Sequence, residues 1–325
     1  MHILITGAAG MLGRKLAERV ARDGGLGGRP VRAMTLIDVV APTAPDGFAG
    51  TVTCLDLDLA TPDTATRLVD ARPDVIFHLA AIVSGEAEAD FAKGYAINLD
   101  STRALFEAIR LAGADYRPRV VFASSIAVVG APLPDAIPDD FHTTPLTSYG
   151  TQKAICELLL SDYTRRGFFD GIGIRLPTIC IRPGLPNKAA SGFFSNILRE
   201  PLVGWPAILP VPDRIRHWHT SPRSAVGFML HAATMDLAAV GPRRNLSMPG
   251  LSATVADQIE ALRRVAGDAA VALIRREPDA AITAMCEGWA PGFQATRARA
   301  LGFTAEDSFD AIIRAHIDDE LGGRL

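Results

Sequence analysis

Cysteine is scarce in this chain of 325 residues, and neither sign of charge is in excess. The four cysteines form neither a C-x-x-C pair nor a Cys/His ligand spacing, which argues against a disulfide framework or a zinc site. We expect them to be small buried residues in a reducing compartment: Cys54, Cys156, Cys180 and Cys286. With 33 basic against 36 acidic residues, the net charge of -3 gives no general attraction for nucleic acid or an anionic membrane. Small molecules are the expected partners.

Long apolar runs are also missing. No segment reaches the roughly 18 apolar residues of a membrane span, and the first residues lack the basic region of a signal peptide. We therefore expect a soluble, unprocessed, cytoplasmic protein. Hydrophobic residues still make up 48% of the chain, and glycine and proline are spread along it. Disorder and fibrous folds are thereby excluded.

Short apolar runs alternate with helical patterns over the first half of the chain. Such alternation is typical of βαβ units, and runs without period-2 relief indicate parallel strands covered by helices on both faces. The expected strands span residues 2–6, 31–38, 51–55, 75–80, 120–124 and 172–176. The predicted fold is α/β: a Rossmann doubly wound parallel sheet flanked by helices, in a domain of residues 1–176.

Residues 177–325 have a different texture. Proline- and glycine-rich loops with clustered arginines run to about Pro249, and helical patterns follow. Residues 254–257 (T-V-A-D) and 304–307 (T-A-E-D) each have the form of a capping box ahead of a helix. We expect a smaller, mixed substrate-binding domain with C-terminal helices here, and expect some later segments to return to the first domain.

A glycine-rich turn follows the first predicted strand. Gly7, Gly10 and Gly13 form G-x-x-G-x-x-G, and the helical pattern 14–21 comes directly after. Strand before and helix after are the context of a dinucleotide site, where glycines let the backbone approach a pyrophosphate. Backbone N–H groups at the helix start, near Met11 and Leu12, would face the phosphates. A glycine turn that binds nothing is the alternative.

Asp38 ends the second predicted strand. A carboxylate there can accept hydrogen bonds from the adenosine ribose and would repel a 2'-phosphate, which favours NAD over NADP. The residues after it supply no arginine or lysine, although Arg14 is a possible phosphate partner. Capping of a turn is the alternative role for Asp38.

In order, these residues resemble the extended short-chain dehydrogenase/reductase family: the T-G-A-A-G-M-L-G loop at 6–13, Asp56-Leu57, His78-Leu79-Ala80-Ala81, Asn98, Ser124-Ser125 and Tyr149-Gly150-Thr151-Gln152-Lys153. The resemblance implies cofactor contacts from Asp56, Leu57, Leu79, Ala80, Ala81 and Asn98, and from Pro177 beside the nicotinamide. It also implies a homodimer formed by two long helices, at about 90–112 and 148–164.

Tyr149, Lys153 and Ser125 are the predicted catalytic residues. Tyr149 and Lys153 are four residues apart and share one face of a helix. A nearby ammonium favours the phenolate, so Tyr149 can accept a proton, and Lys153 can also bind the nicotinamide ribose. By the family pattern Ser125 holds the reacting oxygen, with Ser124 as the competing assignment. An exposed helical pair is the alternative for Tyr149 and Lys153.

A narrower resemblance, over residues 82–91, 191–202 and 216–223, is to family members that use NAD to oxidise D-erythronate, a four-carbon sugar acid, at C2. A sugar acid needs a cation for its carboxylate, and arginine offers a bidentate fork. Arg182 and Arg216 are the candidates, with Arg199 and Arg223 behind them, and Ser84 is a candidate for the hydroxyls. For each arginine a salt bridge is the alternative, and for Ser84 ordinary turn chemistry.

Two other functions stay open. A nucleotide-sugar 4-epimerase would use the same serine, tyrosine and lysine, and the loop arginines could serve its diphosphate. A non-catalytic NAD-sensing protein would not need a proton acceptor. Dehydratases of the family carry an acidic pair after the serine, where this chain has Ile126 and Ala127. No metal site is expected, and His217 and His219 are expected in a pocket or the core.

Overall fold

The computed structural model describes residues 1–184 and 190–324. The chain divides into two compact units, each made of segments far apart in the sequence. The first unit consists of Met1–Val128, Thr147–Arg175 and Val226–Leu246. The second consists of the described residues of Val129–Leu146, Leu176–Ala225 and Ser247–Leu325. Among the described residues no helix is long and apolar enough to cross a membrane.

A seven-stranded sheet forms the centre of the first unit, in the order β12-β8-β7-β6-β1-β4-β5. Its strands are β1 (His2–Thr6), β4 (Ala33–Asp38), β5 (Thr51–Asp56), β6 (Val75–His78), β7 (Arg119–Ser125), β8 (Asp170–Leu176) and β12 (Asn245–Ser247). β1 pairs in parallel with β4 and β6, β4 with β5, and β6 with β7. The predicted Rossmann sheet is confirmed, and the strand order reverses between β1 and β6.

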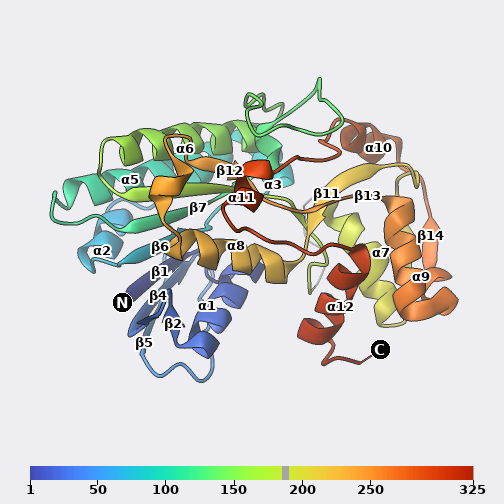
Figure 1. Cartoon of the computed structure of the whole chain (residues 1–325), viewed down its shortest axis with the longest axis horizontal. Helices are drawn as coiled ribbons and strands as arrows, with labels where there is room; N and C mark the ends of the chain where they lie inside the picture. The colour runs from blue at the N-terminus through green and yellow to red at the C-terminus, as the bar shows by residue number, and fades with distance from the viewer. Residues whose placement is uncertain (185–189, 325) are drawn as a thin grey trace. The chain divides into compact units, whose positions relative to one another are not determined.

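Helices cover both faces of this sheet, α5 and α6 on one side and α1 and α8 on the other (Figure 1). The helices are α1 (Met11–Asp23), α2 (Thr64–Asp70), α3 (Ser84–Ala89), α4 (Phe91–Gly94), α5 (Ser101–Leu111), α6 (Ser148–Arg165) and α8 (Pro222–Thr234). Short elements complete the unit: β2 (Gly25–Leu26), β3 (Arg29–Pro30), a π-helix η1 (Tyr95–Asp100), and two 3-10 turns, η2 (Ile126–Val128) and η4 (Leu237–Val240).

The helix expected over about residues 90–112 is confirmed as one helical run, residues 91–111, but it contains a π-helical stretch that the sequence did not predict. Asp90 is extended and caps α4 by accepting a hydrogen bond from the Lys93 N–H at 3.0 Å. The π-helix η1 then separates α4 from α5 and buries Asn98, which is 1% exposed. Apolar periodicity carries no signal for one π turn, because the pattern shifts by a single residue. The helix expected at 148–164 is confirmed as α6.

The second unit is mixed, with more helix toward the C-terminus. Its strands are β9 (Thr178–Ile179), β10 (Ala207–Leu209), β11 (Arg216–Thr220), β13 (Leu251–Thr254) and β14 (Ile274–Arg276). Its helices are η3 (Ala190–Gly192), α7 (Phe193–Leu202), α9 (Val255–Val271), α10 (Ala280–Glu287), α11 (Thr296–Ala300) and α12 (Phe309–Glu320). α7, α9 and α12 pack on a shared apolar core that includes Phe194, Leu262 and Ile312.

One of the two predicted capping boxes exists. Thr254 and Asp257 form a complete box at the start of α9. The box at 304–307 is wrong, because α12 begins later and is capped by Ser308, whose hydroxyl accepts from the Ala311 N–H at 3.2 Å. Glu306 instead accepts hydrogen bonds from the hydroxyl groups of Ser221 and Ser224. Glu306 therefore makes tertiary hydrogen bonds and does not form the capping box that the pattern predicted.

All four cysteines are free, and Cys156, Cys180 and Cys286 are buried as expected. The expectation fails for Cys54, which is exposed. Cys54 lies on β5, the last strand in the sheet order, and every residue of that strand is exposed or half-buried. An edge strand leaves one side without a partner, so an apolar run there does not ensure burial.

Candidate functional site

The glycine loop leads from β1 into α1 with no room for side chains. Gly7 has φ +73°, and a Cβ atom on it would come within 2.7 Å of the Ala80 backbone nitrogen. A Cβ atom on Gly13 would overlap the carbonyl oxygen of Gly7. Gly10 caps α1 with extended backbone and makes no side-chain cap bond to the N–H groups of the first turn. An uncapped helix start beside a bare backbone fits the pyrophosphate of a dinucleotide.

Two predicted acidic residues lie side by side next to this loop. Asp38 and Asp56 end the neighbouring strands β4 and β5 and are partners in the strand register. Asp38 Oδ2 accepts a hydrogen bond from the Ala9 N–H at 3.0 Å, and Oδ1 accepts a longer one, 3.5 Å, from Val40. Asp38 therefore braces the glycine loop as well as a turn. Leu57 follows Asp56 and donates its N–H to the carbonyl of Asp38 at 3.0 Å.

The predicted segment Leu79, Ala80 and Ala81 follows β6 where the strand order reverses. Leu79 donates its N–H to the carbonyl oxygen of Thr6 at 3.2 Å, and Ala80 donates to the Thr6 hydroxyl at 3.2 Å. Ligands of open α/β sheets bind outside the carboxyl ends of the strands at such a reversal. The fold thus brings the glycine loop and the segment after β6 together in one cradle.

Lys153 anchors the start of α6 to the end of β7. Its ammonium donates to the carbonyl oxygen of Ala123 at 2.9 Å and lies 5.8 Å from the centre of the Tyr149 ring. Thr147 caps α6 by accepting from the Gly150 N–H at 3.1 Å. Only 2% of Lys153 is exposed, and burial lowers the pKa of its ammonium to about 8. The predicted tyrosine and lysine are therefore a pair on one helix face, with the lysine buried.

The two serines at the end of β7 have different surroundings. Ser124 donates to Glu157 at 2.6 Å, and Glu157 is ion-paired with Arg175 at 2.7 Å. Ser124 is thus committed to a buried network, which sequence reasoning missed because no local motif links the three residues. Ser125 Oγ accepts only from the Ala127 N–H, at 3.1 Å, among the hydrogen bonds of the described chain. The hydroxyl of Ser125 keeps its proton to donate, which favours it over Ser124.

The remaining predicted residues are distributed over both units. Ser84 begins α3 in the first unit. In the second unit Pro177 lies between β8 and β9, and Arg182 donates to the Ile179 carbonyl and the Ser191 hydroxyl, each at 3.1 Å. Arg216 is ion-paired with Asp135 and lines a hollow of about 320 Å³. Both arginines therefore already hold protein partners.

The two histidines beside Trp218 lie in the core of the second unit, as expected. His217 bonds Thr178 at 2.7 Å and the Ala290 carbonyl at 3.1 Å, and burial lowers its pKa to about 4. His219 is 0% exposed and bonds Gln258 at 3.1 Å. Within residues 1–184 and 190–324, no group of three or more His, Cys, Asp and Glu side chains could hold a metal ion.

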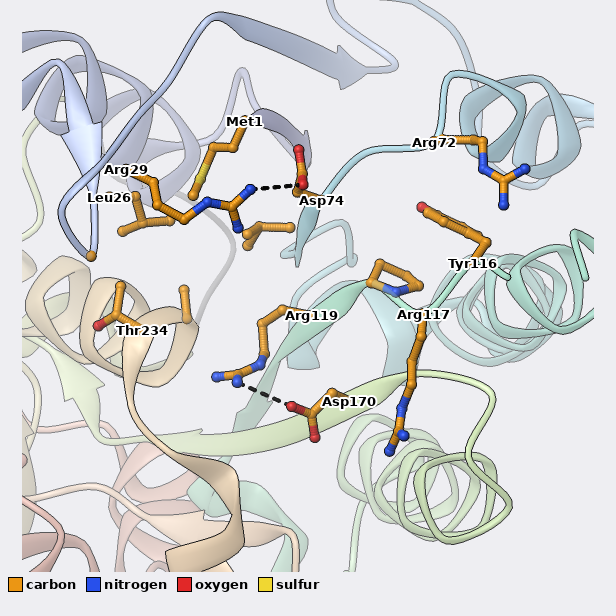
Figure 2. Close-up of a pocket in the computed structure, with 14 residues that line it drawn as sticks. Met1, Leu26, Arg29, Arg72, Asp74, Tyr116, Arg117, Arg119, Asp170 and Thr234 are labelled. Atoms are coloured by element: carbon orange, nitrogen blue, oxygen red, sulfur yellow. Dashed lines mark hydrogen bonds and ion pairs between the residues drawn. The ribbon is translucent and has the colours of Figure 1, made fainter. Parts of the chain in front are cut away.

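A cavity of about 530 Å³ opens in the first unit at the amino ends of β6, β7 and β8 (Figure 2). Arg29 pairs with Asp74 at 3.2 Å and Arg119 with Asp170 at 3.0 Å, as the dashed lines show. The glycine loop, in contrast, follows the carboxyl end of β1. This cavity is therefore separate from the cradle, and most of its charges are already paired.

Comparisons with known proteins identify a family and several relatives. The model of the NAD dependent epimerase/dehydratase family matches residues 3–209. A D-erythronate dehydrogenase of Cupriavidus necator is 47% identical over 323 residues, which cover 98% of each chain. Another from Haemophilus influenzae is 40% identical, covering 99% of this chain and 100% of the relative. A solved structure, named as a nucleoside-diphosphate-sugar epimerase from Agrobacterium tumefaciens, is 74% identical, with a TM-score of 0.98, covering 99% of this chain and 95% of that chain.

The glycine loop gives a first test. Gly13→Ala places a Cβ atom against the Gly7 carbonyl, so we expect the affinity for NAD to fall at least about tenfold. Gly227→Ala is the matched control, because Gly227 is also a helical glycine of the first unit and has no atom within 4 Å of its built Cβ. Titration calorimetry with NAD measures both. Equal affinities in the two variants would contradict the cradle.

Lys153 gives a second test. Lys153→Met relieves the cost of burying the ammonium but also removes its hydrogen bond to the Ala123 carbonyl, so we expect the free energy of unfolding at pH 7 to be unchanged or about 1 kcal/mol higher. The cost is fully present below the folded pKa of about 8 and fades as the pH rises toward the unfolded value of 10.5. The gain should therefore shrink between pH 8 and pH 10.5. Urea unfolding at both ends of this range measures it, and a clear loss of stability at pH 7 would contradict the assignment.

Proposed function

The chain belongs to the NAD-dependent epimerase/dehydratase family, and from that premise we propose that it oxidises D-erythronate at C2 to 2-oxo-tetronate. Relatives that carry the name D-erythronate dehydrogenase over nearly the whole chain support an NAD-dependent sugar-acid dehydrogenase. The observation that carries the proposal is the buried Lys153, which bonds the strand that ends in Ser125 and lies near the Tyr149 ring.

NAD is the cofactor, and when bound it supplies the acceptor for the hydride that leaves C2. Gly7, Gly10 and Gly13 would hold its pyrophosphate at the start of α1, and Asp38 its adenosine ribose. Lys153 would bind the nicotinamide ribose. The contacts proposed for Asp56, Leu57, Leu79, Ala80, Ala81 and Pro177 extend this site along the dinucleotide.

Side chains of this protein orient the C2 hydroxyl and accept its proton. Ser125 donates a hydrogen bond to the substrate oxygen and holds it toward Tyr149. Tyr149, as the phenolate, takes the hydroxyl proton, and the C2–H bond breaks in the same step to leave a ketone. The nearby Lys153 ammonium favours the phenolate over the phenol.

For the substrate carboxylate we propose Arg216, with Arg182 second and Ser84 as a partner for the hydroxyls. The partner of Arg216, Asp135, has a side chain that is 82% exposed, and such pairs are weak, so a carboxylate can replace it. Side-chain hydrogen bonds to the Ile179 carbonyl and the Ser191 hydroxyl hold the Arg182 guanidinium inside its own unit. The homodimer also stays a proposal, which light scattering would test. Leu111 on α5 and Leu158 on α6 are 67% and 69% exposed and suit such an interface.

A nucleotide-sugar 4-epimerase is the second candidate, favoured by the name given to the Agrobacterium tumefaciens structure. An epimerase must return the hydride to the opposite face of a ketone that it retains, so it keeps NAD bound through each turnover. A dehydrogenase releases NADH instead. The two functions therefore differ in a product that can be measured directly.

The direct test offers the purified protein NAD with D-erythronate, L-threonate and related acids. We expect rapid NADH formation with D-erythronate and at least about a hundredfold lower kcat in Tyr149→Phe, because the proton acceptor is lost. Spectrophotometry at the NADH absorbance band measures both proteins. Failure with every acid, together with co-purified NAD and interconversion of UDP-sugars, would replace the dehydrogenase by the epimerase.

Arg216 and its partner separate carboxylate binding from stability. We expect Arg216→Ala to raise KM for the sugar acid about tenfold or more, since a charged hydrogen-bond partner is removed. Asp135→Asn is the matched control, because it breaks the same ion pair and keeps the guanidinium. Its KM should be unchanged or lower. If both variants raise KM equally, the ion pair rather than the free guanidinium matters, and Arg182 becomes the candidate.

A further inference from the structure

The backbone after β6 is held from two sides by buried side chains. Ala80 donates its N–H to the Thr6 hydroxyl at 3.2 Å, on β1. Ile82 donates its N–H to Asn98 Oδ1 at 2.9 Å, and its carbonyl accepts from Asn98 Nδ2 at 3.3 Å. The segment 79–82 is therefore fixed at one end by β1 and at the other by η1.

A continuous chain of hydrogen bonds joins these two ends. The Thr102 hydroxyl donates to the Asn98 carbonyl at 2.8 Å and so accepts from His78 Nε2, also at 2.8 Å. His78 Nδ1 lies 2.7 Å from the Thr6 hydroxyl. Burial lowers the pKa of His78 to about 3, so the ring is neutral and Nδ1 accepts from Thr6. Every donor in the chain then has an acceptor.

Gln152 extends this chain to α6. Asn98 Nδ2 donates its other hydrogen to Gln152 Oε1 at 2.7 Å. Gln152 is 0% exposed and stands between Tyr149 and Lys153 on the same helix. The orientation of both amides follows from Ile82: its N–H requires the asparagine oxygen, so the asparagine nitrogen faces Gln152, which must present its oxygen.

The other end of the Gln152 amide has no partner. Nε2 is buried and makes no hydrogen bond within the described part of the chain. Gly94 gives it room, since a Cβ atom there would come within 2.7 Å of Nε2. An unsatisfied buried donor is costly and rare, so a glutamine in this place needs a reason. The hydrogen bond that Gln152 Oε1 accepts from Asn98 explains why a glutamine is buried here.

We infer that Gln152 is a positioning residue, which acts through Asn98 to hold the segment 79–82 against the helix of Tyr149 and Lys153. The inference rests on the proposed NAD site and deepens it. Both amide hydrogens of Asn98 are used, by Ile82 and Gln152, so Asn98 serves the cofactor through the backbone of Ile82 rather than as a donor. Gln152 thereby links the segment 79–82 to the helix that carries the proton acceptor Tyr149.

The test compares Gln152→Met with Gln258→Met, without any sugar acid. Gln258 is also 0% exposed and also uses its amide in one bond, to His219, in the second unit. In the ligand-free protein we expect hydrogen exchange of the Ile82 amide to become about tenfold faster in Gln152→Met only. The Kd for NAD, by calorimetry, should rise about three- to tenfold, the equivalent of one hydrogen bond.

Thr102→Val keeps the test decisive if Gln152→Met fails to fold. Valine has the shape of threonine but removes the link between His78 and Asn98, so we expect the same two changes in smaller measure. Wild-type exchange at Ile82 and an unchanged Kd for NAD in folded Gln152→Met would overturn the inference. These readouts need no substrate, so a protein that fails to oxidise D-erythronate leaves them unaffected.

Discussion

The hydrogen bond from the buried Lys153 ammonium to the Ala123 carbonyl fixes the start of α6 against the end of β7. Everything proposed for the proton depends on it, because Tyr149 lies one turn before Lys153 and Ser125 lies two residues after Ala123. Burial makes the ammonium costly, and the same burial keeps water from screening its charge. A solvent-exposed lysine, whose charge is screened by water, would favour the tyrosine phenolate less.

The cofactor side of the site is built from backbone rather than from charge. Gly7 and Gly13 let β1, α1 and the segment after β6 approach more closely than any side chain allows. Side-chain hydrogen bonds then hold that segment in place, from Thr6 at one end and Asn98 at the other. A bare, fixed backbone can meet a pyrophosphate without rearranging, which is why rigidity here serves binding.

Features that depend on local pattern could be predicted from the sequence. The apolar runs and the glycine loop were enough for the Rossmann sheet, and the spacing of Tyr149 and Lys153 placed both on one helix. Features that depend on distant partners were not predicted. The π-helix around Asn98 has no signal in the periodicity of the sequence. Glu306 bonds Ser221 and Ser224 instead of the helix start at which the pattern placed it. The sequence places Gln152 between Tyr149 and Lys153, but it does not predict the bond to Asn98, which is 54 residues away.

In the proposed reaction, hydride leaves C2 of the sugar acid for good. The most direct measurement gives the protein NAD and D-erythronate carrying deuterium at C2, and weighs the nucleotide released into solution by mass spectrometry. We expect free NADH one mass unit heavier than normal, formed in equal amount with 2-oxo-tetronate. Deuterium that stays in the sugar acid, with no reduced nucleotide released, would contradict this reaction.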